Sequence, residues 1–380
     1  MPSQPATISH QLTKTENGAA SNFTYDPLNR ITGPTQFNET YAYDNRGNRT
    51  SMTSNSTDSA SHIYSYDRLN RLTTAAKEEE ASVNYRYNGD GLLWERTEGG
   101  QTTRYYWDGD QLIGEGTVSW QVADSASASI QYSGNWATQT EPTDYNGTMS
   151  YSGTAGDRAQ LTFTGTSVQV AVRKGLACGK ATILIDGAVV ATDLDTFSNS
   201  TGRQRQAVIF ARDGLASGTH TIQVVVNGTK NPSAGATNVM LDYIAYGDGT
   251  TTMKARYIRG QGLIAREDAQ SSKTYYHYNG HGDVVNLMDS TGTTKLNTYA
   301  YDIWGNIVTQ KESIAQPFKY SGEFWDNTSS LQYLRARWYD PSMGRFIHED
   351  TYAGQIDNPL TLNLYAYVGN NPVFCFLRGE

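Results

Sequence analysis

The chain has 380 residues, a formal net charge of -8 and a hydrophobic fraction of 37 %, so it is long enough for two or three domains with real cores. Its lysines and arginines occur singly, and this charge balance gives no basic field for phosphates, which excludes nucleic acid as an expected partner. Many tyrosines (26) and glycines (36) with only 18 % charged residues favour strands and turns over helices. We therefore expect an all-β protein.

The N-terminal stretch, residues 1–20, is polar and has no hydrophobic centre like that of a secretory signal peptide. We expect it to be unpatterned. No apolar run along the chain is long enough for a membrane span. The two cysteines, Cys178 and Cys375, lie in different segments and predict neither a disulfide framework nor a metal cluster. We expect no cofactor.

A short repeat begins after residue 20. Each copy has an aromatic residue, a spacer, a tyrosine and then Asp or Asn before a turn. Aromatic residues at i and i+2 share one face of a strand, and the acid or amide can bond the turning backbone. Neighbouring copies in the first block are about 20 residues apart, the size of one hairpin in a repeat array. We expect these hairpins over residues 21–115 and 250–316, with copies that start at Phe23, Tyr41, Tyr64, Tyr85, Tyr276 and Tyr299.

The repeat is interrupted over residues 116–249, where alternating apolar and polar residues predict a different arrangement of strands. Asp186-Gly187, between two of these segments, is a strong signal for a tight hairpin. Many short strands separated by turns indicate a β-sandwich or jelly roll. We expect a separate domain here, inserted at a hairpin tip. Its expected strands are 159–164, 167–173, 181–185, 188–192, 206–211, 220–226 and 239–246.

The repeat units at residues 25–30 (YDPLNR) and 66–71 (YDRLNR) resemble the YD repeats of the RHS (rearrangement hot spot) family, which are similar to those of teneurins and Tc-toxin C components. Residues 318–326, 331–341 and 344–346 resemble the RHS-associated core, which we expect over residues 317–380. The resemblance implies a hollow shell of spiralling antiparallel hairpins. In that family the shell encapsulates and delivers a toxic C-terminal domain.

The insert resembles galactose-binding-like jelly-roll modules of extracellular carbohydrate enzymes. The resemblance rests on residues 132–136 (YSGNW), 185–187 (IDG), 214–221 (GLASGTHT) and 241–244 (LDYI). That family binds sugars by stacking aromatic side chains in end loops. It implies Trp136, Tyr132 and Tyr145 as candidates for contact with a cell-surface glycan. Trp136 also suits a core position beside the first strand, because large aromatic side chains favour burial.

The RHS-associated core implies an autoproteolytic site, in which two carboxylates share one proton. By position, Arg337 matches the family's arginine and Asp350 its first aspartate. The second aspartate would fall at Leu377, so the pair is incomplete and we expect neither self-cleavage nor any other enzymatic activity. Asp340 and Asp357 are the alternative carboxylates. The chain stops eight residues after Pro372, so we also expect no toxin domain in it.

One further pair of residues has a spacing used by metal sites. His277 and His281 are four residues apart, but they flank a strand that runs into a turn, where both rings do not share a helical face. We expect no metal there.

The leading hypothesis is structural: an incomplete RHS shell of a bacterial polymorphic-toxin or cell-surface protein, lacking its toxin and secreted or surface-exposed. Its expected partner is the remaining shell or a toxin segment. The alternatives are adhesion, through glycan binding by the insert, and, disfavoured, an autoproteolytic aspartyl enzyme.

Overall fold

The computed structural model describes residues 13–16, 19–34, 39–54, 60–78, 80–198 and 203–372. Within them the chain forms strands β1 to β32 and four short 3₁₀ helices, so the prediction of an all-β fold is confirmed. Among these residues no helix is both long and apolar enough to cross a membrane. Cys375 and Leu377 lie outside the described residues.

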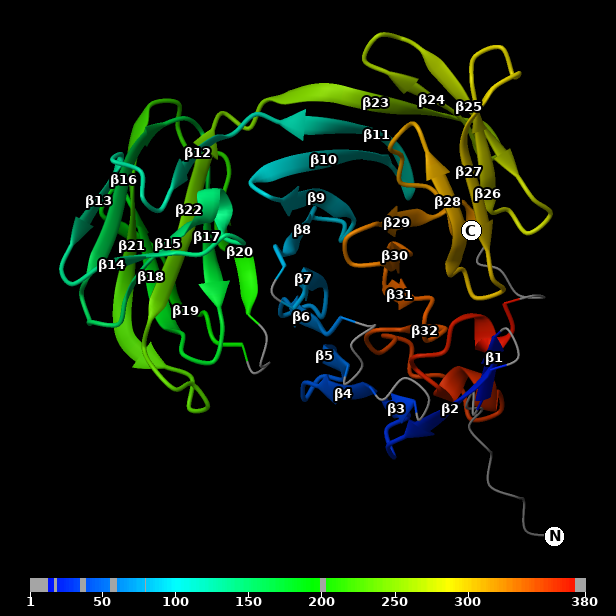
Figure 1. Ribbon diagram of the computed structural model, residues 1–380, viewed down its shortest axis with the longest axis horizontal. Helices are drawn as coiled ribbons and strands as arrows, with labels where there is room; N and C mark the ends of the chain where they lie inside the picture. The colour runs from blue at the N-terminus through cyan, green and yellow to red at the C-terminus, as the bar shows by residue number, and fades with distance from the viewer. Residues whose placement is uncertain are drawn as a thin grey trace.

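One antiparallel sheet of 14 strands forms a curved wall, blue at one end and orange at the other in Figure 1. We call this sheet the wall. In order from one edge to the other, its strands are β4 (Glu39–Tyr43), β5 (Arg49–Ser54), β6 (His62–Tyr66), β7 (Leu72–Lys77), β8 (Val83–Tyr87), β9 (Leu93–Glu98), β10 (Gln101–Asp108), β11 (Gln111–Val118), β23 (Thr251–Arg259), β24 (Leu263–Asp268), β25 (Lys273–Tyr278), β26 (Val284–Met288), β27 (Lys295–Tyr301) and β28 (Ile307–Glu312).

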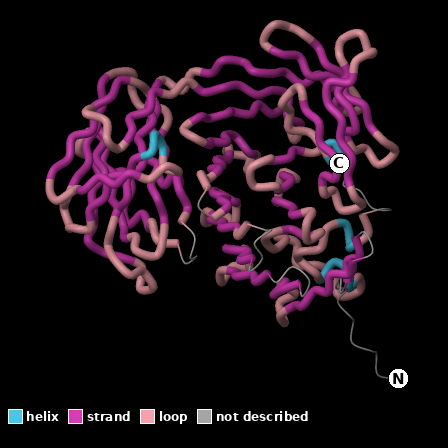
Figure 2. The backbone as a smooth tube through the Cα atoms, viewed as in Figure 1, coloured by secondary structure: helices cyan, strands magenta, loops and turns pink. Residues whose placement is uncertain are grey.

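The two blocks of hairpins join inside this sheet. β11 pairs directly with β23, with Val118 opposite Thr251, although residues 119–250 lie between them in sequence. Figure 2 shows these residues leaving the wall and returning to it as two adjacent strands. The wall is therefore continuous across the interruption.

Residues 119–250, which we call the sandwich, form two antiparallel sheets that pack face to face over an aliphatic core. The first contains β14 (Ala137–Thr140), β15 (Thr148–Ser152), β22 (Val239–Gly247), β17 (Ser167–Lys174) and β20 (Gln204–Arg212), with β12 (Gln121–Asp124) also on β22. The second contains β13 (Ile130–Ser133), β16 (Arg158–Thr164), β21 (Thr219–Lys230), β18 (Gly179–Ile185) and β19 (Ala188–Asp195). A 3₁₀ turn, η1 (Tyr145–Gly147), precedes β15.

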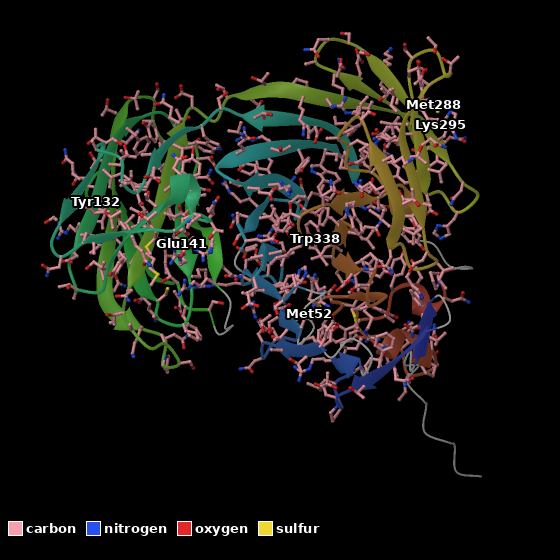
Figure 3. All side chains as sticks on the ribbon, in the orientation of Figure 1. Met52, Tyr132, Glu141, Met288, Lys295 and Trp338 are labelled. Atoms are coloured by element: carbon pink, nitrogen blue, oxygen red, sulfur yellow. The ribbon has the colours of Figure 1, made fainter. Side chains whose placement is uncertain are left out.

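Residues 318–372, which we call the plug, fill the concave side of the wall. The inward tyrosines of both hairpin blocks, such as Tyr85 and Tyr276, share one buried core with Phe318 and Trp338 of the plug. In Figure 3 Trp338 lies inside the curve of the wall. The plug contains β29 (Phe324–Asp326), β30 (Leu331–Tyr333), β31 (Trp338–Asp340), β32 (Arg345–Phe346), η2 (Tyr320–Gly322), η3 (Pro359–Leu362) and η4 (Val368–Asn370).

The acid or amide of each repeat closes its turn. The Asp67 Oδ1 atom accepts hydrogen bonds from the backbone N–H groups of Leu69 and Arg71, each 2.9 Å long. A shorter side chain could not reach these donors and a longer one would lose more conformational freedom, which explains the choice of Asp or Asn. The same pair of bonds recurs at Asp26, Asp44, Asn88, Asn279 and Asp302.

The tyrosine before that turn ties each hairpin to the previous one. The Tyr87 hydroxyl donates a 2.7 Å hydrogen bond to the carbonyl oxygen of Leu72, the first residue of β7. Each acceptor is the first residue of the preceding return strand, so one side chain fixes both the spacing and the register of adjacent hairpins. Equivalent bonds join Tyr66 to Arg49, Trp107 to Leu93, Tyr278 to Leu263 and Tyr301 to Val284.

The N-terminal stretch differs from its expectation. Within residues 1–20, β1 (Thr13–Glu16) forms and β2 (Ala19–Tyr25) begins, and together with β3 (Ile31–Pro34) they make a separate three-stranded sheet. β1 contains no apolar residue, so hydrophobic alternation could not reveal it. The remaining residues of that stretch lie outside the described part.

The sandwich is held against the outer face of the wall. Asn84 faces away from the plug, because its neighbour Tyr85 faces inward. Its side-chain amide donates a hydrogen bond to the Gln206 carbonyl and accepts one from the Val208 N–H, both 2.9 Å long and both to the backbone of β20. An ion pair between Arg86 and Asp213 and a bond from Trp120 Nε1 to Thr102 Oγ1 add to this contact. β20 is the sandwich strand nearest the wall in Figure 1.

Candidate functional sites

The structure brings together Arg337 and Asp350, the two residues expected as remnants of an autoproteolytic site. The distance from Arg337 Nη2 to Asp350 Oδ2 is 2.5 Å. The guanidinium also stacks on the Phe346 ring, with its carbon 3.6 Å from the ring centroid, and donates to the Leu364 carbonyl. Burial lowers the pKa of Arg337 to about 10, while Asp350 opposes the shift. At neutral pH the Arg337 guanidinium therefore stays protonated.

Neither alternative acid is placed for proton sharing. Asp340 is buried and accepts from Arg49 Nη2 at 2.6 Å and from Ser342 Oγ at 2.5 Å. Burial favours its neutral form, but Arg49 and Ser342 outweigh burial and lower the pKa of Asp340. Asp357 is exposed in the loop before η3. Leu377, the expected position of the second aspartate, lies outside the described residues, and the structure shows here the Arg337–Asp350 ion pair.

Tyr132 and Trp136 form one aromatic pair in the sandwich, with ring centroids 5.0 Å apart. Both side chains are half-buried and pack against the sandwich core. The Tyr132 hydroxyl donates to the Ser125 carbonyl at 2.7 Å, whereas the buried indole Nε1 of Trp136 has no hydrogen-bond partner in the described part of the chain. Tyr132 lies on the sheet farther from the wall (Figure 3).

Tyr145, the third candidate for sugar contact, belongs to a different cluster. Its ring centroid is 5.1 Å from that of Tyr243, and it packs with Trp120 and Val208 on the sheet that faces the wall. A Cβ atom at Gly100, in the turn between β9 and β10, would lie 2.9 Å from the Tyr145 ring. Tyr145 therefore occupies the contact between sandwich and wall, apart from the Tyr132–Trp136 pair.

The two histidines are separated. His281 is bonded to Asp283 Oδ1 at 2.7 Å, while His277 is exposed on β25. Among the described residues no group of three or more His, Cys, Asp or Glu side chains could hold a metal ion.

Sequence reasoning did not single out a cleft of about 730 Å³ at the rim of the wall, beside the sandwich. Arg266 of β24 and Lys254 of β23 line it, together with Trp120. Arg266 lies opposite Tyr257 in the register, so it occupies an inward position of the wall. A charged residue at an inward position of the wall can indicate a binding site. The strand pairing that shows Arg266 to be at such a position is, however, known only from the fold.

Parts of the chain resemble a described protein family and several known proteins. A family model described as the teneurin YD-shell matches residues 248–373. A tRNA3(Ser)-specific nuclease WapA of Bacillus spizizenii is 35 % identical over 156 residues, which are 40 % of this chain and 7 % of that protein. The toxin protein Tse5 of Pseudomonas aeruginosa is 29 % identical over 103 residues, 27 % of this chain and 7 % of that protein.

The name of a third relative describes an enzyme that acts on carbohydrate. An A type blood alpha-D-galactosamine galactosaminidase of Flavonifractor plautii is 33 % identical over 127 residues, 33 % of this chain and 11 % of that protein. The chain thus spans only a small part of these relatives. Among solved structures, the TcdB2-TccC3 structure aligns with 94 % of this chain and 21 % of that chain, at 14 % identity and a TM-score of 0.29.

A wall of Tyr-x-Tyr-Asp hairpins wrapped around an aromatic plug defines a YD-repeat shell. In this respect the chain is similar to the RHS/YD-repeat proteins. Its wall and plug form a structural shell, and the relative Tse5 is named a toxin protein.

Proposed function

We propose that this chain builds part of the wall of a secreted or surface-exposed shell, whose partner is the remaining shell or a toxin segment. The supporting observation is that one sheet of 14 strands combines both hairpin blocks around a single core. The concave faces of these strands are already covered by the plug. A toxin domain therefore needs shell volume that a partner segment supplies.

The test of this role measures protection of a cargo. An unfolded peptide with a protease site is fused after Glu380 and expressed either with this chain alone or with the adjoining shell segment from the same genome. We expect the peptide to be cleaved in the first case and protected in the second. Equal cleavage in both would contradict a shell function.

We further propose that the chain has no catalytic activity of its own. The WapA relative is named a tRNA nuclease, but this chain spans 7 % of it, and we place that activity in the remainder of such proteins. Incubation with end-labelled total tRNA should leave the tRNA intact. Cleavage that persists through a further purification step would contradict the proposal.

Self-cleavage is tested by mass. Among the described residues the structure shows Asp350 paired with Arg337 and not with a second carboxylate that could share a proton, so the purified chain should keep the 41.9 kDa of its sequence. The Asp350→Asn variant should have the same intact mass within the change expected for one residue. A wild-type chain clipped near its C-terminus, together with an intact variant, would establish the disfavoured autoproteolytic function.

Adhesion is the second candidate function, and the Tyr132–Trp136 pair together with the galactosaminidase relative favours it. In this reading residues 116–249 are an inserted galactose-binding-like module. The full chain is screened on immobilised glycans beside Trp136→Ala and Tyr145→Phe, with melting temperatures to show that both variants fold. We expect binding to be lost in Trp136→Ala and kept in Tyr145→Phe. If the wild type binds no glycan, the sandwich is a spacer.

A further inference from the structure

The cleft at the rim of the wall lies where four strands end beside the sandwich. It has a volume of about 730 Å³, and its residues come from β10, β11, β23, β24, the turn after β24, the segment that leads into the sandwich, and Ile314 after β28. Its size exceeds that of an inorganic ion and suits a small organic ligand. The Tyr132–Trp136 pair does not line it.

Arg266 is the unusual residue of this cleft. It is 7 % exposed, yet in the part of the chain that the structure describes its guanidinium takes part in no hydrogen bond or ion pair, and its Nε is fully buried. Asp268, two residues on, uses Oδ1 to accept from the N–H groups of Gln270 and Ser272. An unpaired buried cation costs several kcal/mol, so an acceptor from outside the chain would stabilise it.

The other lining groups define the chemistry of that acceptor. Lys254 adds a second cation, whose Nζ is 3.6 Å from Glu115 Oε1. Trp120 is half-buried and presents an indole at one side, with its Nε1 bonded to Thr102. Exposed amides from Gln101 and Gln270 complete the lining. Cations, an aromatic surface and amides together match a ring with hydroxyl groups and a carboxylate.

We propose that this cleft binds an acidic oligosaccharide, a chain that contains hexuronate. The uronate carboxylate pairs with Arg266 and Lys254, a pyranose face packs on Trp120, and the hydroxyls bond Gln101, Gln270 and the carboxylate of Asp268. The nearby Asp268 would repel a simple anion but accepts hydrogen bonds from sugar hydroxyls, which favours a saccharide. Glycan binding here is independent of binding at the Tyr132–Trp136 pair.

The test is calorimetric titration of the full chain with tetragalacturonate, with a neutral galactotetraose as the matched probe. Tetragalacturonate should bind and the neutral probe should bind at least tenfold more weakly. Arg266→Gln should weaken tetragalacturonate binding about tenfold or more, because a charge-assisted bond is lost. Arg256→Gln, an exposed change on the opposite face of β23, should leave binding unchanged. Trp136→Ala should also leave it unchanged.

A second readout uses the protein without ligand. Arg266→Gln should melt at the same temperature as the wild type or at a higher one, because the substitution removes an unpaired buried cation. A large fall would show that the chain itself satisfies the guanidinium, and would overturn the proposal. Equal affinity for the acidic and neutral probes, tighter binding of a hexaglutamate peptide, or competition by sulfate at concentrations equal to those of tetragalacturonate would each overturn the assigned ligand class.

Discussion

Arg49 of β5 and Asp340 of β31 form a buried ion pair, with Nη2 and Oδ2 2.6 Å apart and side chains 5 % and 8 % exposed. It links the wall to the plug. Asp340→Asn would leave a buried guanidinium without its counter-charge, and we expect a loss of about 3–5 kcal/mol in the free energy of unfolding. Urea titration followed by tryptophan fluorescence measures this loss. The exposed pair Arg46–Asp44 provides the comparison: Arg46→Ala should cost less than about 1 kcal/mol.

The hydrogen bonds from the repeat tyrosines to the preceding hairpins predict that two tyrosines of β25 contribute differently to stability. Tyr278 donates a 2.6 Å hydrogen bond to the Leu263 carbonyl, whereas Tyr275 of the same strand makes no side-chain hydrogen bond within the described residues, although the two side chains are similarly exposed, at 39 % and 37 %. Tyr278→Phe should lower the free energy of unfolding by about 1 kcal/mol, the usual net value of one such bond. Tyr275→Phe should have almost no effect in the same urea titration. Equal effects of the two changes would mean that the hydroxyl does not hold adjacent hairpins together.

The two hydrogen bonds of Asn84 allow a prediction of how strongly β20 of the sandwich is attached to the wall. Asn84→Ala leaves the Gln206 carbonyl and the Val208 N–H without their partners, and should cost about 2 kcal/mol. Hydrogen exchange at the Val208 amide should accelerate, while exchange at Leu241, inside the sandwich, should not change. Asp213→Asn, which breaks a half-exposed ion pair with Arg86, should have a smaller effect. Unchanged exchange at Val208 in Asn84→Ala would mean that other contacts hold β20 in place.

Stability should fall in mild acid because of two histidines, the buried His348 and the half-buried His62. Burial lowers the pKa of His348 and of His62 from 6.5 to about 4. Between these values the unfolded chain binds more protons than the folded chain, so the free energy of unfolding decreases as pH falls through this window. For His348, which is 6 % exposed, the full loss is about 3 kcal/mol. Thermal melts at steps from pH 7 to 4 should be less pH-dependent in His348→Gln than in the wild type, and an equal pH dependence of the two would contradict the prediction.

Local chemistry explains why much of this fold could be predicted. The turn after Tyr66 depends on bonds from Asp67 to residues two and four positions away, so the repeat itself contains the information. In the sandwich, Asp186 and Gly187 both have positive φ, 50° and 78°, as a tight hairpin requires. The strand expected at 188–192 is β19, Ala188–Asp195. Its end differs because the limits of edge strands depend on their neighbours.

Contacts between distant segments explain what could not be predicted. Arg337 and Asp350 are both indicated by the family resemblance and lie in contact, but the partners of Asn84 are backbone groups of β20 that no side-chain pattern marks. Tyr145 and Trp136 are both aromatic residues near the start of the sandwich, yet Trp136 packs against the aliphatic core and Tyr145 belongs to a separate cluster with Tyr243. Arg266 reads as an ordinary charged residue until the register places it inward.

The direct pairing of Val118 with Thr251 has a consequence for how such proteins change over time. The chain leaves the wall at the end of β11 and returns at the start of β23, and these two strands are neighbours in one sheet. For the wall, residues 119–250 therefore fill the place of a hairpin turn. Another module could be inserted at this position without altering the register of the strands on either side. Such an exchange would remove the β20 partners of Asn84 and the Asp213 partner of Arg86, so a new module would require substitutions on β8 as well as at the other contacts with the wall, such as Thr102.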